Sequence, residues 1–163
     1  MARHPNAPAL AQSGFTLVEV SVVVLVIGLL IAIVIPTFLG AQQRAQDRVA
    51  QSGLRNGLST AKVLFTDGET YATADAASLN AAEPAIHFVE NVALRKSDIP
   101  TRDVSVQEDE TSWGAAALSD SETCFYILDP GDGPVRYGSA PVVGNNCRGS
   151  KATVANTPST NGW

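Results

Sequence analysis

Apolar residues are unevenly distributed along this chain, and their longest run lies close to its N-terminus. Between Leu17 and Leu39 the clearly polar residues are Glu19, Ser21 and Thr37. A helix over this stretch would be about 35 Å long, at roughly 1.5 Å per residue, which is enough to cross the hydrocarbon core of a bilayer. The pattern therefore predicts a membrane-spanning helix.

After this run the pattern changes to that of an amphipathic helix. Apolar residues recur at three- and four-residue spacing, at Ala50, Leu54, Leu58, Ala61, Leu64 and Phe65, with Gly57 in the same stripe. We predict one long helix over residues 15–66, ended at Gly68, whose second half packs this stripe on a sheet. The bases of this half, among them Arg44 and Lys62, are expected to point elsewhere, towards solvent or neighbouring molecules.

Two residues interrupt the apolar half of the predicted helix. Gly28 lowers helix propensity, and Pro36 cannot donate a hydrogen bond to the Ala32 carbonyl. We therefore predict a bend or a locally melted turn in this region.

The remainder of the chain has the pattern of short strands separated by Pro, Gly and Asp. The predicted strands cover residues 85–92, 104–107, 112–118, 123–129 and 135–139. The turn at 129–134 joins the last two into an antiparallel hairpin. Segment 67–103 is expected to be loop or short helix before the sheet, and the polar tail 151–163 is expected to be loose. The fold class is thus α+β, a long helix packed on a small antiparallel sheet.

Charge is segregated between these regions. Residues 41–66 carry four bases and one acid, a net charge of +3, whereas residues 67–163 carry six bases and fourteen acids, a net charge of −8. An acidic head argues against non-specific binding of nucleic acid, which requires basic surface to neutralise phosphates. It suits a soluble head outside the cell.

The chain has two cysteines, Cys124 and Cys147. In a chain that crosses a membrane, an even pair near the C-terminus predicts a disulfide in an oxidising compartment, with two unrelated buried thiols as the alternative. The two cysteines and the two histidines, His4 and His87, are too few to predict a metal site. His87, beside Phe88 in an alternating run, is expected to be a partly buried strand residue.

Motifs for catalysis are missing from the sequence. It contains no GxGxxG, no Walker loop and no HExxH, and one of its two histidines lies within the first 14 residues. We therefore predict that the protein is not an enzyme and takes no cofactor.

The first 14 residues, MARHPNAPALAQSG, are not an ordinary secretory signal, which would place its apolar region before the cleavage site. The candidate junction here, Gly14–Phe15, lies before the apolar run. Cleavage there would leave the apolar segment as the new N-terminus of the protein.

The stretch GFTLVEV, followed by an apolar run ending near a proline, resembles the class III signal of type IV prepilins and pseudopilins. The resemblance implies that a membrane peptidase cuts after Gly14 and methylates the Phe15 amine, and it makes Glu19 the family's acid. It also implies a type IV pilin-like fold. The leader carries only Arg3, fewer bases than such leaders usually have, so orientation is weakly encoded; we place the leader in the cytoplasm.

Glu19 heads the apolar run, and a charge at mid-membrane depth costs about 2.5–3.5 kcal/mol. After cleavage the Phe15 amine lies four residues away, and the amine of a neighbouring subunit can also approach, so the charge can be compensated. The resemblance assigns this pairing to subunit register in a growing filament. The alternative is a Glu19 side chain that only reaches the interface of a single-pass anchor.

Taken together, the resemblance divides the chain into a leader (1–14), a transmembrane and filament-core helix (15–40), an amphipathic helix half (41–66) and a β-rich head with a C-terminal disulfide loop (67–163). It implies a structural subunit of a type IV pilus-like filament, held in the cytoplasmic membrane with its head outside and then assembled into an extracellular filament. The implied partners are prepilin peptidase, identical or related pilin subunits and an inner-membrane assembly platform.

Several alternatives stay open at this point. The chain is also consistent with a pseudopilin of a type II secretion system, with a DNA-uptake pilin, and with an enzyme or binding domain that uses the helix as a tether. The cysteine pair resembles the disulfide-closed loop of many pilins, and it slightly favours a pilin over a major pseudopilin. Some major pseudopilins bind calcium in C-terminal loops, and the turn containing Asp129 and Asp132 is rich in oxygen, although turn chemistry alone accounts for it. In type IV filaments the segment between residues such as Gly28 and Pro36 can extend, and a simple kink is the alternative here.

Overall fold

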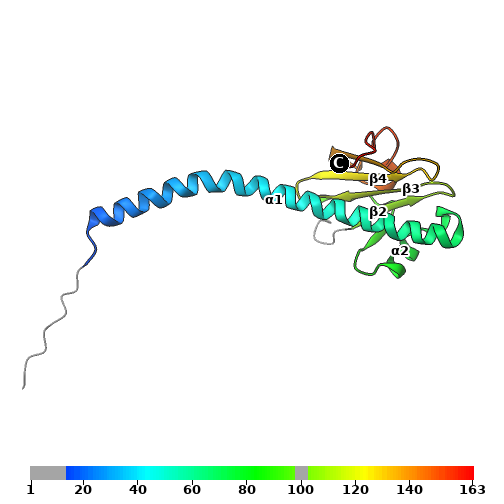
Figure 1. Ribbon diagram of the computed structural model, residues 1–163, viewed down its shortest axis with the longest axis horizontal. Helices are drawn as coiled ribbons and strands as arrows, with labels where there is room; N and C mark the ends of the chain where they lie inside the picture. Colours follow the sequence, from blue (N-terminus) through cyan, green and yellow to red (C-terminus); the bar gives the residue numbers. More distant parts are fainter. Residues whose placement is uncertain (1–13, 98–102) are drawn as a thin grey trace, which may run out of the picture. The chain divides into compact units, whose positions relative to one another are not determined.

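The computed structural model describes residues 14–97 and 103–163, and for residues 36 and 37 only the backbone (Figure 1). The chain divides into two units, Met1–Gly40 and Ala41–Trp163. A single helix, α1 (Leu17–Gly68), contributes to both. Its length and composition would allow it to cross a membrane, as the apolar run predicted.

The helical backbone of α1 continues through Gly28 and Pro36. The locally melted turn predicted as one possibility in this region is therefore not formed in the structure. At its C-terminal end the helix runs two residues beyond the predicted end at residue 66. Gly68 is the last helical residue, and Glu69 adopts the left-handed conformation, with φ of 55°, that ends the helix. Its backbone N–H donates to the Phe65 carbonyl at 2.6 Å.

A five-stranded sheet forms the centre of the unit Ala41–Trp163. Its strands are β1 (Phe88–Glu90), β2 (Val104–Glu108), β3 (Trp113–Leu118), β4 (Thr123–Asp129) and β5 (Arg136–Pro141), in spatial order β1-β2-β3-β4-β5. Neighbours from β2 to β5 are antiparallel, and β4 and β5 form the predicted hairpin. The sheet is thus mainly antiparallel, as predicted, with one departure at its edge, where β1 pairs parallel to β2. No hairpin turn links these two strands, and the connection 91–103 is of the length that a parallel crossover needs.

The second half of α1 covers one face of this sheet, as the apolar stripe predicted (Figure 1). Leu54 and Ala61 are fully buried, together with Trp113 and Ile127 from the strands. At Gly57 the helix approaches the sheet so closely that a Cβ atom would lie 2.9 Å from the ring of Phe88. The amphipathic pattern therefore determines which face of the helix packs on the sheet. The absence of a side chain at Gly57 allows the close distance between them.

Both edges of the sheet are covered by other parts of the chain, which limits edge-to-edge pairing. After the short helix η1 (Tyr71–Thr73), helix α2 (Ala76–Ala82) places Asn80 beside β1. The Asn80 amide donates to the Phe88 carbonyl at 2.9 Å and accepts from the Phe88 N–H at 2.8 Å, as a neighbouring strand would. On the opposite edge, β5 is bridged by the C-terminal segment through Tyr137 and Ser159.

The prediction of a loose tail is therefore wrong. Trp163 donates its indole N–H to the Gly138 carbonyl at 2.8 Å and packs edge-on against Phe125 and Tyr137. Gly138 allows the C-terminal segment to pass close to β5, since a Cβ at this position would lie 1.8 Å from the Asn156 carbonyl oxygen. The indole adds to the Tyr137–Ser159 bridge in docking this polar segment, because it buries apolar area and still satisfies its N–H.

Candidate functional site

The start of α1 is capped by Thr16. Its hydroxyl oxygen accepts a hydrogen bond from the Glu19 N–H at 3.1 Å, which satisfies one of the free N–H groups of the first helical turn. Thr16 and Glu19 have the spacing of a capping box, and an acid in the first turn is favoured by the helix dipole. The pattern Thr-x-x-Glu could have revealed this cap by Thr16 from the sequence.

The apolar part of α1 has no covering layer in this structure. All side chains from Gly14 to Ile35 are exposed, and Phe15 is 82% exposed. An apolar surface of this length is incompatible with water and needs lipid or other apolar helices around it. The predicted site residues thus lie together at the N-terminal end of an apolar surface that requires partners; they are Gly14, Phe15 and Glu19.

Within the unit Ala41–Trp163, the Asp47 side chain connects α1 to the turn that joins β3 and β4. One of its carboxylate oxygens, Oδ1, accepts from the hydroxyls of Ser119 at 2.7 Å and Ser121 at 2.5 Å. Asp47 is the one acid in residues 41–66. No local pattern in the sequence reveals this role of Asp47, because its partners lie more than 70 positions away in the chain.

The sequence led us to expect that the bases of α1 point away from the sheet. Two of them instead reach towards it. The Arg55 guanidinium lies 5.1 Å from the centre of the Trp163 ring, and Lys62 Nζ lies 3.0 Å from Asp129 Oδ2. Long side chains on the border of the buried face reach back to the sheet, which is why the simple division into faces failed. Arg44 and Arg48 are exposed, as expected.

Asp129, named above as part of an oxygen-rich turn, is buried and already bonded. Besides Lys62, it accepts from the Tyr71 hydroxyl at 3.0 Å and from the Gly131 N–H at 2.9 Å. Burial, together with the nearby negative charge of Asp129, raises the pKa of the Tyr71 hydroxyl well above its ordinary value. Among residues 14–97 and 103–163, no group of three or more His, Cys, Asp or Glu side chains is placed to hold a metal ion.

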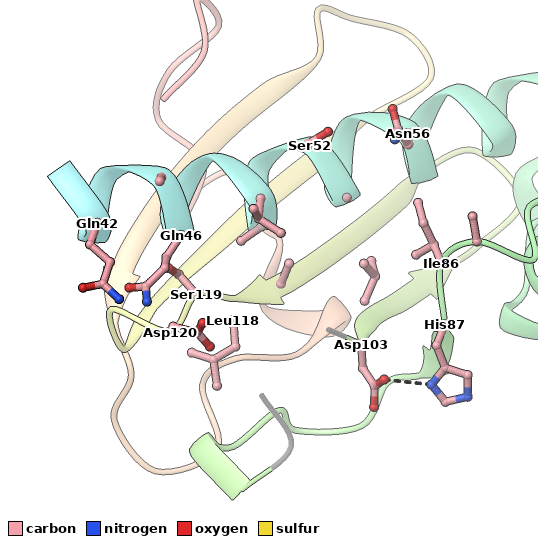
Figure 2. Close-up of a pocket in the computed structure, with 17 residues that line it drawn as sticks. Gln42, Gln46, Ser52, Asn56, Ile86, His87, Asp103, Leu118, Ser119 and Asp120 are labelled. Carbon is pink, nitrogen blue, oxygen red and sulfur yellow. Dashed lines mark hydrogen bonds and ion pairs between the residues drawn. The ribbon is translucent and has the colours of Figure 1, made fainter. Parts of the chain in front are cut away.

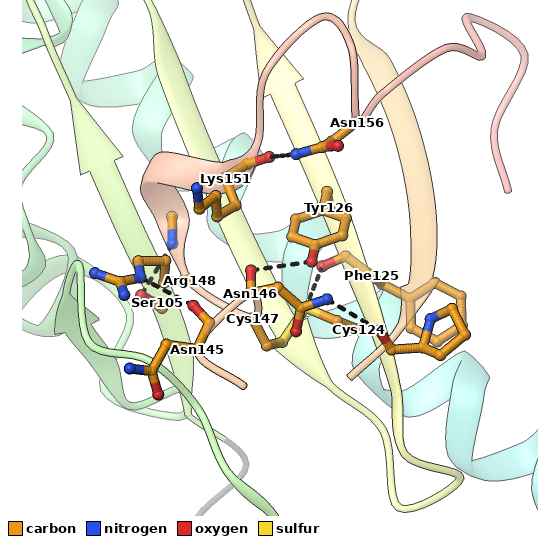
Figure 3. The surroundings of a disulfide bond; sticks show 12 residues. Ser105, Cys124, Phe125, Tyr126, Asn145, Asn146, Cys147, Arg148, Lys151 and Asn156 are labelled. Atoms are coloured by element: carbon orange, nitrogen blue, oxygen red, sulfur yellow. Dashed lines mark hydrogen bonds between the residues drawn. A yellow bond between two sulfur atoms is a disulfide. The ribbon is translucent and has the colours of Figure 1, made fainter. Parts of the chain in front are cut away.

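Cys124 on β4 and Cys147 form a buried disulfide (Figure 3). The bridge closes a loop with a sequence separation of 23, for which the chain-entropy model gives a stabilisation on the order of 3 kcal/mol. Two hydrogen bonds hold the same loop. The Tyr126 hydroxyl donates to the Asn146 carbonyl at 3.0 Å, and the Leu94 N–H donates to the Cys147 carbonyl at 2.7 Å.

An open groove of about 550 Å³ lies between α1 and the adjoining ends of β2 and β3 (Figure 2). Gln42, Gln46 and Asn56 line one wall, and His87 lies at the other. The prediction of a partly buried strand residue is wrong for His87. It precedes β1, its side chain is 63% exposed, and its Nδ1 lies 2.8 Å from Asp103 Oδ1. The predicted strand, 85–92, began three residues too early, because the short strand β1 begins only at Phe88.

Comparison with known proteins addresses the N-terminal region directly. Residues 10–35 match the family model described as the prokaryotic N-terminal methylation motif. The chain is 33% identical over 67 residues to the type IV wide pilus major component PilA4 of Thermus thermophilus, covering 41% of this chain and 51% of that protein. It is 38% identical over 58 residues to the type IV major pilin protein PilA of Myxococcus xanthus, covering 36% of this chain and 26% of that protein. The chain thus carries the N-terminal motif of the type IV pilin and pseudopilin family and is similar to members of that family.

Relatives from both branches of this family are similar to the chain. The type II secretion system core protein G of Vibrio cholerae is 39% identical over 67 residues, covering 39% of this chain and 44% of that protein. The chain thus spans about half the length, or less, of the curated relatives it matches. No solved structure matches it significantly. The proteins named are thus components of type IV pili and of type II secretion systems.

Proposed function

We propose that this protein is a structural subunit of a type IV pilus-like surface filament. The observation that carries the proposal is the fully exposed apolar helix from Leu17 to Ile35, headed by Gly14, Phe15 and Glu19. In the membrane, lipid tails cover this helix. In a filament, the same surface is covered by the helices of neighbouring subunits, so that one segment serves both states.

Processing precedes assembly in this proposal. Prepilin peptidase cuts between Gly14 and Phe15, removing the leader 1–14 on the cytoplasmic side and leaving the head 67–163 outside. Segment 15–40 then forms the filament core, and segment 41–66 holds the head on it. The protein leaves the membrane through an inner-membrane assembly platform and acts without catalysis, cofactor or nucleic acid.

Glu19 pairs with the Phe15 amine after cleavage. In the first helical turn the carboxylate is favoured by the helix dipole, and in a dry bundle it needs an opposite charge as well. The amine of its own chain or of a neighbouring subunit supplies that charge. An incoming subunit placed in the wrong register would leave both charges uncompensated, so the pair selects the register.

A second candidate is a pseudopilin of a type II secretion system, the same architecture in a short periplasmic filament. The similarity to type II secretion system core protein G from Vibrio cholerae favours it. A DNA-uptake pilin is opposed by the acidic head, and a membrane-tethered binding domain leaves the peptidase motif without a purpose.

The experiment combines two measurements on the full-length chain in its own cells. Intact-mass analysis of the membrane-extracted protein is expected to give a chain starting at methylated Phe15. A mature N-terminus beyond Ile35, as ordinary signal cleavage would leave, would overturn the proposal. Deletion of the gene is then expected to remove sheared surface filaments; a loss of secreted proteins with filaments unchanged would favour the pseudopilin instead.

A further inference from the structure

The four bases on the second half of α1 lie on one stripe of the helix. Arg44, Arg48, Arg55 and Lys62 are spaced so that, at about 100° per residue, all four fall within roughly 40° of one another. The two nearer the C-terminal end of the helix have partners in their own head, the Trp163 ring and the Asp129 carboxylate. Arg44 and Arg48 are exposed, and within the described part of the chain their guanidinium groups have no ion pair or hydrogen bond.

Unpaired charge of the opposite sign lies at the other end of the same helix half. Asp67 is in the last turn of α1, Glu69 follows it, and Glu110 lies beside them, since the Glu110 carbonyl accepts from Thr70 Oγ1 at 3.0 Å. All three acids are exposed. Across residues 14–97 and 103–163, their carboxylates have no hydrogen bond or ion pair. We call this group the acidic end.

The acidic end is unfavourable for the chain on its own. The C-terminus of a helix carries partial negative charge and is stabilised by bases in its last turn. The last turn of α1 contains no base; it contains Asp67, and Glu69 directly follows the last helical residue, Gly68. Acids at the C-terminus of a helix, with no base nearby to offset them, are unfavourable for folding and are expected where a function requires them. A basic partner would supply that compensation.

We propose that Arg44 and Arg48 of one copy of this chain dock on the acidic end of a second copy. The inference rests on the proposed function, because it takes the partner to be another filament subunit. Along α1 the two charged regions are roughly 35 Å apart, at about 1.5 Å per residue, so one chain cannot pair them with each other. The contact therefore joins two different patches of two copies, Arg44 and Arg48 on one, Asp67, Glu69 and Glu110 on the other.

A contact of this kind repeats along a filament. Two unlike patches form a heterologous interface, which generates an open array when it does not close on itself. Copies inserted with their heads on the same side of the membrane have parallel helices, which excludes an antiparallel two-fold pair. The charge contact thus acts along the filament, at the level of the heads, separately from any pairing of Glu19 in the helical core.

Charge reversal tests the contact. Three full-length variants are expressed as the sole copy: Arg44→Glu with Arg48→Glu, Asp67→Lys with Glu69→Lys, and all four substitutions together. Each two-residue reversal is expected to lower the ratio of sheared filaments to processed membrane pool by at least about tenfold, because like charges then meet. The four-residue variant restores opposite charges and is expected to recover filaments. Lys151→Glu, an exposed reversal elsewhere on the head, is the matched control and should leave the yield unchanged.

A second readout does not depend on surface filaments. Arg48→Cys combined with Glu69→Cys, oxidised in membranes, is expected to give a ladder of dimers and larger species that neither single variant gives. This ladder reports the contact whether the filament is a surface pilus or a short pseudopilus. A wild-type chain without surface filaments would count against the proposed function alone, and the ladder would then decide the contact.

Three results would overturn the inference. They are normal yield from both two-residue reversals, absence of recovery in the four-residue variant, or absence of the cysteine ladder. A fall in the processed membrane pool confined to the Arg44 and Arg48 reversal would assign these bases to lipid headgroups instead. Peptide mapping of the Cys124–Cys147 bridge in each membrane pool verifies that the head has folded.

Discussion

Lys62 on α1 reaches the carboxylate of Asp129 at the end of β4, with Nζ 3.0 Å from Oδ2. The two sides of the pair differ in environment, because the Asp129 side chain is 5% exposed and that of Lys62 is 50% exposed. Tyr71 and the Gly131 N–H donate to the same carboxylate. One buried acid thus joins the helix, the segment that follows it and the last hairpin turn of the sheet.

The asymmetry of this pair predicts unequal mutational effects. Asp129→Ala leaves the Tyr71 hydroxyl and the Gly131 N–H without an acceptor, so we expect the free energy of unfolding to fall by about 2–3 kcal/mol. Lys62→Met removes a half-solvated charge and keeps the alkyl packing, so a loss of about 1 kcal/mol or less is expected. Urea unfolding of the detergent-solubilised full chain, followed by tryptophan fluorescence, measures both. Equal losses would show that the ion pair, rather than the hydrogen bonds, dominates at this acid.

A half-buried acid, Glu108, makes the unit Ala41–Trp163 sensitive to pH. Burial, together with the negative charges of Glu90 on β1 and of Asp75 before α2, raises the pKa of Glu108 from an ordinary value of 4.5 to about 7. Glu108 Oε2 has no hydrogen-bond partner among the described residues, and Glu90 already accepts from the Ala76 N–H. The folded head therefore favours protonated Glu108. This stabilisation is fully present below the ordinary pKa and is lost as pH rises through about 7.

Glu108→Gln, which is neutral at every pH, isolates this effect. At about pH 8 the variant should be more stable than the wild type, and by about pH 4 the difference should approach zero. Urea midpoints across this range measure the difference between the two proteins, so that other titrating groups cancel. Glu110→Gln, an exposed acid on the following turn, is the control and should show no such trend. A constant difference at all pH values would assign the effect to packing.

The fold could be predicted to the extent that its signals are local. The apolar run, the amphipathic stripe and the strand 123–129 are set by periodicity, and the structure confirms each of them. Cys124 and Cys147 could be paired because the chain offers no other cysteine. The parallel edge at β1 could not be predicted, because direction depends on how a connection crosses the sheet and no local pattern encodes it.

Contacts between distant positions account for what was missed around α1 and for the error in the C-terminal segment. The Lys62–Asp129 pair, the Asp47 contacts with Ser119 and Ser121, and the docking of Trp163 all join segments far apart in the chain. The candidate site at Gly14, Phe15 and Glu19 was found from a motif, which reports what a family does with these residues.

The docked C-terminal segment provides a further prediction. Trp163→Ala removes the ring that packs on Phe125 and Tyr137 and the hydrogen bond to the Gly138 carbonyl. Because Trp163 is only half-buried, we expect a loss of about 1–3 kcal/mol in the free energy of unfolding. Arg55→Ala removes only the cation on the outer face of the ring and should cost about 0.5–1 kcal/mol. Urea unfolding followed by far-UV circular dichroism tests both, and a Trp163→Ala variant as stable as wild type would mean the segment is not docked in solution.

The last prediction concerns Glu19 and separates the charge of its carboxylate from the helix cap that Thr16 provides. Glu19→Ala should insert into the membrane normally, because the segment becomes more apolar, and cleavage at Gly14 should largely survive. Ordered assembly should fail, since the amine of Phe15 loses its compensating charge in the bundle. Glu19→Gln keeps the volume and suits a capping box, but it lacks the charge, so it should also assemble poorly.

Thr16→Ala is the matched control for these variants. It removes the hydroxyl that caps the Glu19 N–H, at a cost of about 1 kcal/mol to the start of the helix, and it leaves the carboxylate in place. Each variant is expressed without wild type, and sheared filaments are quantified against the processed membrane pool. Filaments from Thr16→Ala but not from Glu19→Gln would assign the role to charge. Normal filaments from both Glu19 variants would show that the carboxylate only reaches the membrane interface, and a fall in the processed pool itself would place Glu19 in maturation.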